Sequence, residues 1–103
     1  MKEIITRGTT PAFSFTLPFA AEQVKSLFLT FCQGNKRILE KSLEDCRKDD
    51  CVVCVTLTQT ETFLFDEKQN VNLQLRLTDS DGNAFASPVF TLGVKNVLKG
   101  GTI

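Results

Sequence analysis

The strongest constraint on the fold of this chain is a two-residue alternation of apolar and polar side chains. Its clearest instance is one continuous run: Val71, Asn72, Leu73, Gln74, Leu75, Arg76, Leu77 and Thr78. Successive side chains of a β-strand point to opposite faces, so the run predicts a strand with one buried face and one solvated face. An antiparallel sheet accommodates this pattern, because it can pack on one face while the other meets water.

The same period recurs in three further segments, at residues 13–17, 27–32 and 53–58. Their regularly spaced apolar residues are Phe13, Phe15, Leu17, Leu27, Leu29, Phe31, Val53, Val55 and Leu57. Between the runs, Gln33–Asn35 and Asp79–Asn83 each contain a glycine, which favours a hairpin turn. We therefore expect short strands connected by tight turns.

Other local patterns predict breaks between the strands. Ala20–Val24 and Thr58–Glu61 each predict one helical turn, because the first follows Pro18 and the second has the Ser/Thr-x-x-Glu capping pattern. The turn at Thr58 is expected to cross between sheets. Pro88 predicts a strand start, a bulge or an edge. The charged segment Leu43–Asp50 is expected to be a solvated loop.

These patterns together predict the fold class. About seven short strands in a chain of 103 residues are typical of an all-β, antiparallel, immunoglobulin-like β-sandwich, and we expect residues 1–103 to form a single such domain. All nine aromatic residues are phenylalanine, which has no polar atom, so we expect these rings mainly in the core. Without tryptophan, the Cys-Trp-Cys pattern of antibody domains is missing, and the strand order stays open.

Composition argues against several classes of partner. The 12 Lys and Arg residues balance the 12 Asp and Glu residues without a long basic cluster, so we expect no nucleic-acid partner. No segment has the ~18 consecutive apolar residues of a membrane-spanning helix, so no membrane partner is expected. Met1–Arg7 lacks the apolar run of a signal peptide. This predicts synthesis in a cytoplasm, with export only as part of a larger assembly.

The sequence has no recognisable catalytic motif, and the protein is expected not to be an enzyme. It has no histidine, the commonest general base for a serine or cysteine nucleophile. Asp79 and Asp81 before Gly82 match the start of a calcium-binding loop, but Phe90 stands where that loop needs a glutamate. A hairpin turn is the favoured interpretation there, and we expect no cofactor.

The cysteines leave three options open. Cys46, Cys51 and Cys54 lie close together in the sequence and Cys32 lies apart, and four thiolates can hold a zinc ion. Free structural thiols are favoured, because the spacing lacks two Cys-x2-Cys knuckles and residues three apart on a strand face opposite ways. A small zinc-binding protein is one alternative, and a disulfide such as Cys46–Cys51 is another.

The candidate partner-binding residues fall into two groups: the polar rungs Asn72, Gln74 and Arg76, and the apolar Val89, Phe90 and Leu92. The polar rungs share the solvated face of one strand, where they can hydrogen-bond a protein or a sugar. An ordinary wet sheet face has the same pattern. The apolar group is expected in a core strand or at an edge that pairs with another chain.

The layout of the chain is defined by these stretches: Ile4–Pro11, Phe13–Leu17, Val55–Phe63, Val71–Leu77, Ser87–Val89 and Val97–Gly101. Over nearly the whole length it resembles small proteins encoded by prophages of Gram-positive gut bacteria. It is also similar to the N-terminal, immunoglobulin-like domain of phage upper baseplate proteins, in which a small β-sandwich plugs a host-recognition module into the tail. The resemblance implies a structural role, synthesis in the bacterial cytoplasm and association with a virion, and it supplies no active-site residues.

The leading hypothesis is a non-enzymatic structural or adaptor protein of a phage or prophage particle, associated with the tail or baseplate. It would dock onto other phage structural proteins, or onto itself, through sheet edges and loops. A host-surface carbohydrate-binding module is the alternative from another class, although the chain lacks the tryptophan and tyrosine platforms that stack on sugars. The zinc protein is the third hypothesis.

Overall fold

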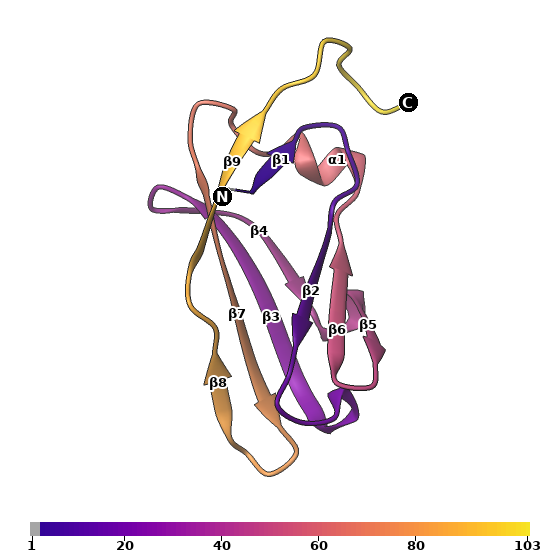
Figure 1. The fold of residues 1–103 in the computed structure, drawn as a ribbon. Helices are drawn as coiled ribbons and strands as arrows, with labels where there is room; N and C mark the ends of the chain where they lie inside the picture. Colours follow the sequence, from indigo (N-terminus) through magenta and orange to yellow (C-terminus); the bar gives the residue numbers. More distant parts are fainter. Residues whose placement is uncertain (1–2) are drawn as a thin grey trace.

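Two β-sheets pack face to face in the computed structural model, which describes residues 3–103 (Figure 1). The strands of the large sheet are β1 (Ile4–Thr6), β3 (Val24–Gln33), β4 (Lys36–Ser42), β7 (Val71–Asp79), β8 (Ala84–Ala86) and β9 (Phe90–Lys95). The strands of the small sheet are β2 (Ala12–Thr16), β5 (Cys46–Asp49) and β6 (Val52–Thr56). Met1 and Lys2 lie outside the described residues. They belong to the N-terminal segment in which no signal peptide was expected.

The chain passes repeatedly from one sheet to the other, and short helical turns make most of these crossings. The strand order is β1-β9-β7-β3-β4 in the large sheet, with β8 also beside β7, and β2-β6-β5 in the small sheet. One 3-10 turn, Ala21–Gln23, leads from β2 to β3, and a second, Leu43–Asp45, leads from β4 to β5. The short helix α1 (Gln59–Thr62) leads from β6 to β7. The helical turns predicted after Pro18 and at Thr58 are therefore confirmed.

The core lies between the two sheets and is built from alternate residues of the strands. Its buried apolar residues are Ile5, Leu17, Ala21, Val24, Leu27, Leu29, Phe31, Val53, Val55, Leu57, Phe65, Val71, Leu73, Leu75, Leu77 and Leu92. The alternation predicted along β3, β6 and β7 is confirmed, because each apolar member of those runs is buried. Phe31 is fully buried, and its ring centroid lies 5.6 Å from that of Phe13 and 5.8 Å from that of Phe65.

The strand count and the strand directions differ from the sequence prediction. The described residues form nine strands where about seven were expected for a sandwich of this size. The expectation of a purely antiparallel fold is wrong, since β1 pairs with β9 in parallel, with Ile4 opposite Gly93 and Thr6 opposite Lys95. This pairing joins segments near the two ends of the chain, so no local pattern could indicate it.

The prediction of a loop over Leu43–Asp50 is also wrong. After the 3-10 turn, Cys46–Asp49 forms β5, which pairs antiparallel with β6 from Cys46 opposite Val55 to Asp49 opposite Val52. The strand is an edge strand of the small sheet, so its charged side chains remain in water while its main chain bonds to β6. The segment has the charge that is typical of a loop and lacks a clear apolar-polar alternation, so its sequence did not indicate a strand.

The two predicted hairpin turns are confirmed, and each glycine takes a left-handed conformation. Gly34 has φ 62° between β3 and β4, and Gly82 has φ 86° between β7 and β8. In the second turn the carboxylate of Asp79 accepts main-chain hydrogen bonds from Asp81 and Asn83, at 3.0 and 2.9 Å. The hydrogen bond from the side-chain amide of Asn83, supported by these main-chain donors, lowers the pKa of Asp79. The carboxylate thus closes a turn.

The corner between β1 and β2 is held by Thr62, the last residue of α1, and by Phe63, which follows it. The main-chain N–H of Gly8 donates to Thr62 Oγ1 at 2.9 Å, and the hydroxyl of Thr62 donates to the carbonyl of Thr9 at 3.0 Å. A Cβ on Gly8 would lie 2.8 Å from Cζ of Phe63, and Arg7 stacks on that same ring at 5.3 Å from its centroid. The glycine therefore allows the crossing strand to approach α1 closely.

Helix α1 is fixed to the large sheet by one partly buried ion pair. Glu61 accepts a hydrogen bond from the main-chain N–H of Thr58 at 2.8 Å, which completes the predicted capping box, and forms a salt bridge with Lys41 of β4. Burial acts to raise the pKa of Glu61, but the hydrogen bond and charge of Lys41 and the main-chain donor outweigh it and lower that pKa. The charged form of Glu61 is thus the one that stabilises the fold.

We expect Glu61→Gln to lower the free energy of unfolding by roughly 1 kcal/mol near pH 7. Because the pKa of Glu61 is lower in the folded state than its ordinary value of 4.5, the contribution is complete above that pH and is lost as the pH falls through the folded-state value. Urea titrations of both proteins from neutral to acid pH measure the difference. Glu40→Gln, which breaks the more exposed pair with Arg37, is the control. A difference that stays constant with pH would contradict the assignment.

Candidate functional site

The two-sheet stack is closed on one side and open on the other. On the closed side the chain itself joins β4 of the large sheet to β5 of the small sheet. On the open side the small sheet ends at β2, which pairs with β6 alone among the described strands, whereas the large sheet continues past β7 to β8 and β9. Figure 1 shows β8 and β9 at the opposite side of the view from β5 and β6.

The free edge of β2 presents unpaired main-chain groups. Leu17 N–H donates to the carbonyl of Cys51 at 2.7 Å, and Leu57 N–H donates to the carbonyl of Pro11 at 2.9 Å. Paired and unpaired residues alternate along an edge strand of an antiparallel ladder, so Phe13 and Phe15 bond to β6. The N–H and C=O groups of the intervening Ala12, Ser14 and Thr16 therefore point to the open side.

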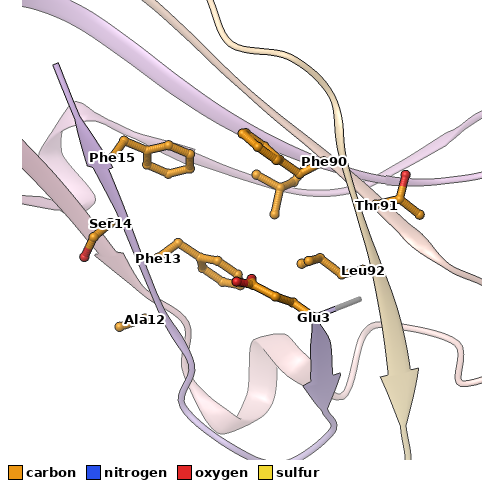
Figure 2. A pocket seen from close by; sticks show the side chains of 9 residues that line it. Glu3, Ala12, Phe13, Ser14, Phe15, Phe90, Thr91 and Leu92 are labelled. Carbon is orange, nitrogen blue, oxygen red and sulfur yellow. The ribbon is translucent and has the colours of Figure 1, made fainter. Parts of the chain in front are cut away.

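An apolar groove runs along this edge between β2 and the outer strands of the large sheet. One hollow of about 400 Å³ lies beside Phe13, Phe15 and Leu92, with the side chain of Glu3 at its end (Figure 2). A second hollow of about 460 Å³ is lined mainly by apolar residues, with three small hydroxyl residues among them: Ser14, Phe15, Thr16, Leu17, Pro18, Phe19, Leu75, Leu77, Phe85, Ala86, Ser87, Pro88 and Phe90. Both hollows include Ser14, Phe15 and Phe90, so they form one continuous groove.

Phenylalanine rings from β2 and from the segment after it face rings of β9 and β8 across the groove. The ring centroids of Phe15 and Phe90 lie 6.3 Å apart, and those of Phe19 and Phe85 lie 5.4 Å apart. Phe85 is 41% exposed and Phe90 is 43% exposed, although both point to the inner face of their sheet. The expectation that the phenylalanines lie mainly in the core is therefore wrong for these two residues and for Phe28.

The structure separates the two groups of predicted partner-binding residues. Phe90 and Leu92 lie on β9 and line the groove, while Val89 lies just before that strand and is exposed. Sequence reasoning missed Phe85 and Glu3, which come from a short strand and from the segment before β1. Phe85 lies between two alanines, which offer no alternation to reveal it.

The polar rungs Asn72, Gln74 and Arg76 lie on the outer face of the large sheet, away from the groove. Two of them hold neighbouring strands: Asn72 accepts from the hydroxyl of Thr91 at 2.9 Å, and Gln74 donates to the carbonyl of Ser87 at 2.9 Å. Arg76 is exposed, and it lines a shallow hollow of about 300 Å³ on this outer face.

The shallow outer hollow contains an exposed aromatic ring. Phe28, which is 45% exposed, lies directly opposite Arg76 in the register between β3 and β7. Thr30 and Glu40 also line the hollow, and the hydroxyl of Thr30 donates to the Glu40 carboxylate at 3.2 Å. An apolar surface beside a cation and a carboxylate is thus available on this face.

The four cysteines are free thiols and do not converge on a common centre. Cys32 lies on the outer face of the large sheet and Cys54 on the outer face of the small sheet, whereas Cys46 packs against the core. Burial, followed by the neighbouring charge of Asp45, raises the pKa of the Cys46 thiol. Across residues 3–103 no group of three or more Cys, His, Asp or Glu side chains is placed to hold a metal ion.

No protein-family description matches this chain, and no curated protein matches it significantly. Among the residues that the structure describes, no helix combines the length and apolar character needed to cross a membrane.

The groove phenylalanines should contribute far less to stability than the buried one. Phe31→Ala is expected to lower the free energy of unfolding by roughly 3–5 kcal/mol, because it empties a closed site in the core. Phe85→Ala and Phe90→Ala should each cost no more than about 1.5 kcal/mol, since much of each ring already meets water. Urea unfolding followed by circular dichroism measures all three. A cost for Phe90→Ala equal to that for Phe31→Ala would mean that the groove is part of the core.

Proposed function

We propose that the protein is a non-enzymatic structural or adaptor component of a phage or prophage particle, associated with the tail or baseplate, that acts by docking onto other proteins. The observation that carries the proposal is the open side of the sandwich, where the unpaired edge of β2 borders a groove lined by exposed phenylalanines. Unpaired sheet edges and apolar surface patches are features that protein partners cover. As part of the same hypothesis, we propose that the sandwich is immunoglobulin-like and that it is related to the N-terminal domain of phage upper baseplate proteins.

The test is whether the chain is part of a particle. Prophage induction in a strain that encodes this chain, followed by density-gradient purification of the particles, should recover the chain in proportion to the tail proteins by quantitative mass spectrometry. Particles from a strain lacking the gene provide the control. Recovery of the chain only from the soluble lysate, with none in purified particles, would overturn the proposed function.

Carbohydrate binding is the second candidate, and the outer-face hollow is the observation that favours it. An aromatic ring beside Arg76 and Glu40 can pack against a sugar while the charged groups bond its hydroxyls. Titration calorimetry with host cell-wall polysaccharide should then show saturable binding that Phe28→Ala and Arg76→Ala each weaken roughly tenfold. Phe85→Ala, which removes an exposed ring on the inner face, is the matched control. No saturable heat, or equal losses in all three variants, would exclude this candidate.

A further inference from the structure

We propose that the open side accepts one extended segment of a partner protein, which pairs with β2 as an added strand. Its alternate apolar side chains would fill the groove, and a basic residue would meet Glu3. This inference rests on the proposed docking function and specifies the chemistry of the segment that docks.

The main chain of β2 is suited to receive a strand. Ala12, Ser14 and Thr16 direct their N–H and C=O groups outward at alternate positions, which is the spacing at which an adjacent strand offers its own donors and acceptors. None of these groups has a main-chain partner elsewhere in residues 3–103. In strand addition the main chain supplies affinity, and pockets for alternate side chains supply specificity.

The groove supplies those pockets. A strand beside β2 would lie above β8 and β9, so every second side chain would point at the apolar inner face of the large sheet. The leucines of β7 line the inner side of the groove, and the ring pairs Phe15–Phe90 and Phe19–Phe85 lie at two points along it. Small or branched apolar side chains between these ring pairs would bury the exposed parts of Phe85 and Phe90.

The edge of β2 also lacks the features that discourage strand pairing. Natural sheets protect free edges with charged side chains. The edge strands on the closed side follow this rule, because β4 includes Lys36, Arg37 and Lys41, and β5 includes Arg47 and Lys48. The sequence of β2 is Ala-Phe-Ser-Phe-Thr, and that of β8 is Ala-Phe-Ala. The strands β2 and β8 are thus uncharged, and the outward edge of β2 is unpaired as well.

The shape of the open side favours a single strand over a second copy of the domain. The large sheet extends past β2 by its outer strands, so a copy that added its own β2 would bring its own β8 and β9 into the same space. Of the described residues that line the groove, only Glu3 is charged, and no described cation pairs with its carboxylate. Figure 2 shows that side chain reaching over Phe13 at the end of the groove. A Lys or Arg at one end of the added strand complements it.

The test uses the full chain, labelled with ¹⁵N, and blocked synthetic peptides of about eight residues. One peptide alternates Val and Thr and ends in Lys; it is made with the Lys at either terminus, because the strand direction is not specified. A second contains the same residues with the valines contiguous, and a third ends in Glu. The alternating Lys peptide should bind saturably, shift the amide signals of Ala12, Ser14 and Thr16 and slow their hydrogen exchange. The rearranged peptide should bind roughly tenfold more weakly.

Two variants of the protein locate the binding. Ser14→Pro removes an outward N–H that makes no bond to β6, a position at which an edge strand tolerates proline, and should weaken binding roughly tenfold. Ser14→Ala keeps that N–H and should bind normally. Glu3→Lys should reverse the preference between the Lys and Glu peptides. Two further peptides are N-methylated on the main chain, each at one of the two sets of alternate residues. Only the peptide whose methylated N–H groups would face β2 should lose binding, which tests the pairing without altering the protein.

Several results would overturn the proposal: no saturable binding by any alternating peptide, equal binding of the rearranged peptide, or an unchanged charge preference in Glu3→Lys. Concentration-dependent dimerisation that Ser14→Pro abolishes would assign the edge to a second copy and would also overturn it. These outcomes differ from failure of the proposed function. A chain that is absent from particles but binds the peptides loses its phage role alone, and a chain present in particles with an inert groove loses only the strand-docking site.

Discussion

The packing of unequal sheets around Phe31 is the constraint on which the rest of the structure depends. Phe31 is fully buried and packs against the rings of both Phe13 and Phe65, and so it joins β3 to the small sheet and to the segment after α1. Because side chains alternate along each strand, this contact decides which face of every neighbouring strand turns inward. Six strands then cover three, and a strip of the larger inner face has no strand above it.

The sequence predicted the elements whose pattern is local. The alternation from Val71 to Leu77, the glycine turns at Gly34 and Gly82, and the capping box at Thr58 all appear where the residues indicated. The parallel pair of β1 and β9 could not be predicted, because it joins residues about ninety positions apart. Strand β5 is local in the sequence but was missed because an edge strand exposed to water carries the same charged residues as a loop.

The groove could be predicted only in part. Alternation places Phe90 on the inner face of the large sheet, but it cannot reveal that the small sheet stops short of it. Burial depends on which strand lies above a residue, and this is a property of the strand order. The same limit explains why Gln74 was predicted to bind a partner. Its side-chain amide donates to the carbonyl of Ser87, which lies between β8 and β9, and the pattern of β7 alone does not indicate this contact.

The two sides of the sandwich differ in how well their free sheet edges are protected against pairing with another strand. On the closed side the connection from β4 to β5 and a row of charged residues make further pairing costly, because an approaching strand would have to desolvate lysine and arginine side chains. On the open side neither protection is present, and the exposed rings gain from being covered. The edge that is least costly to extend therefore borders the surface that gains most from extension. This coincidence of an unpaired main chain with exposed phenylalanines is what distinguishes the open side from the charged edge strands β4 and β5.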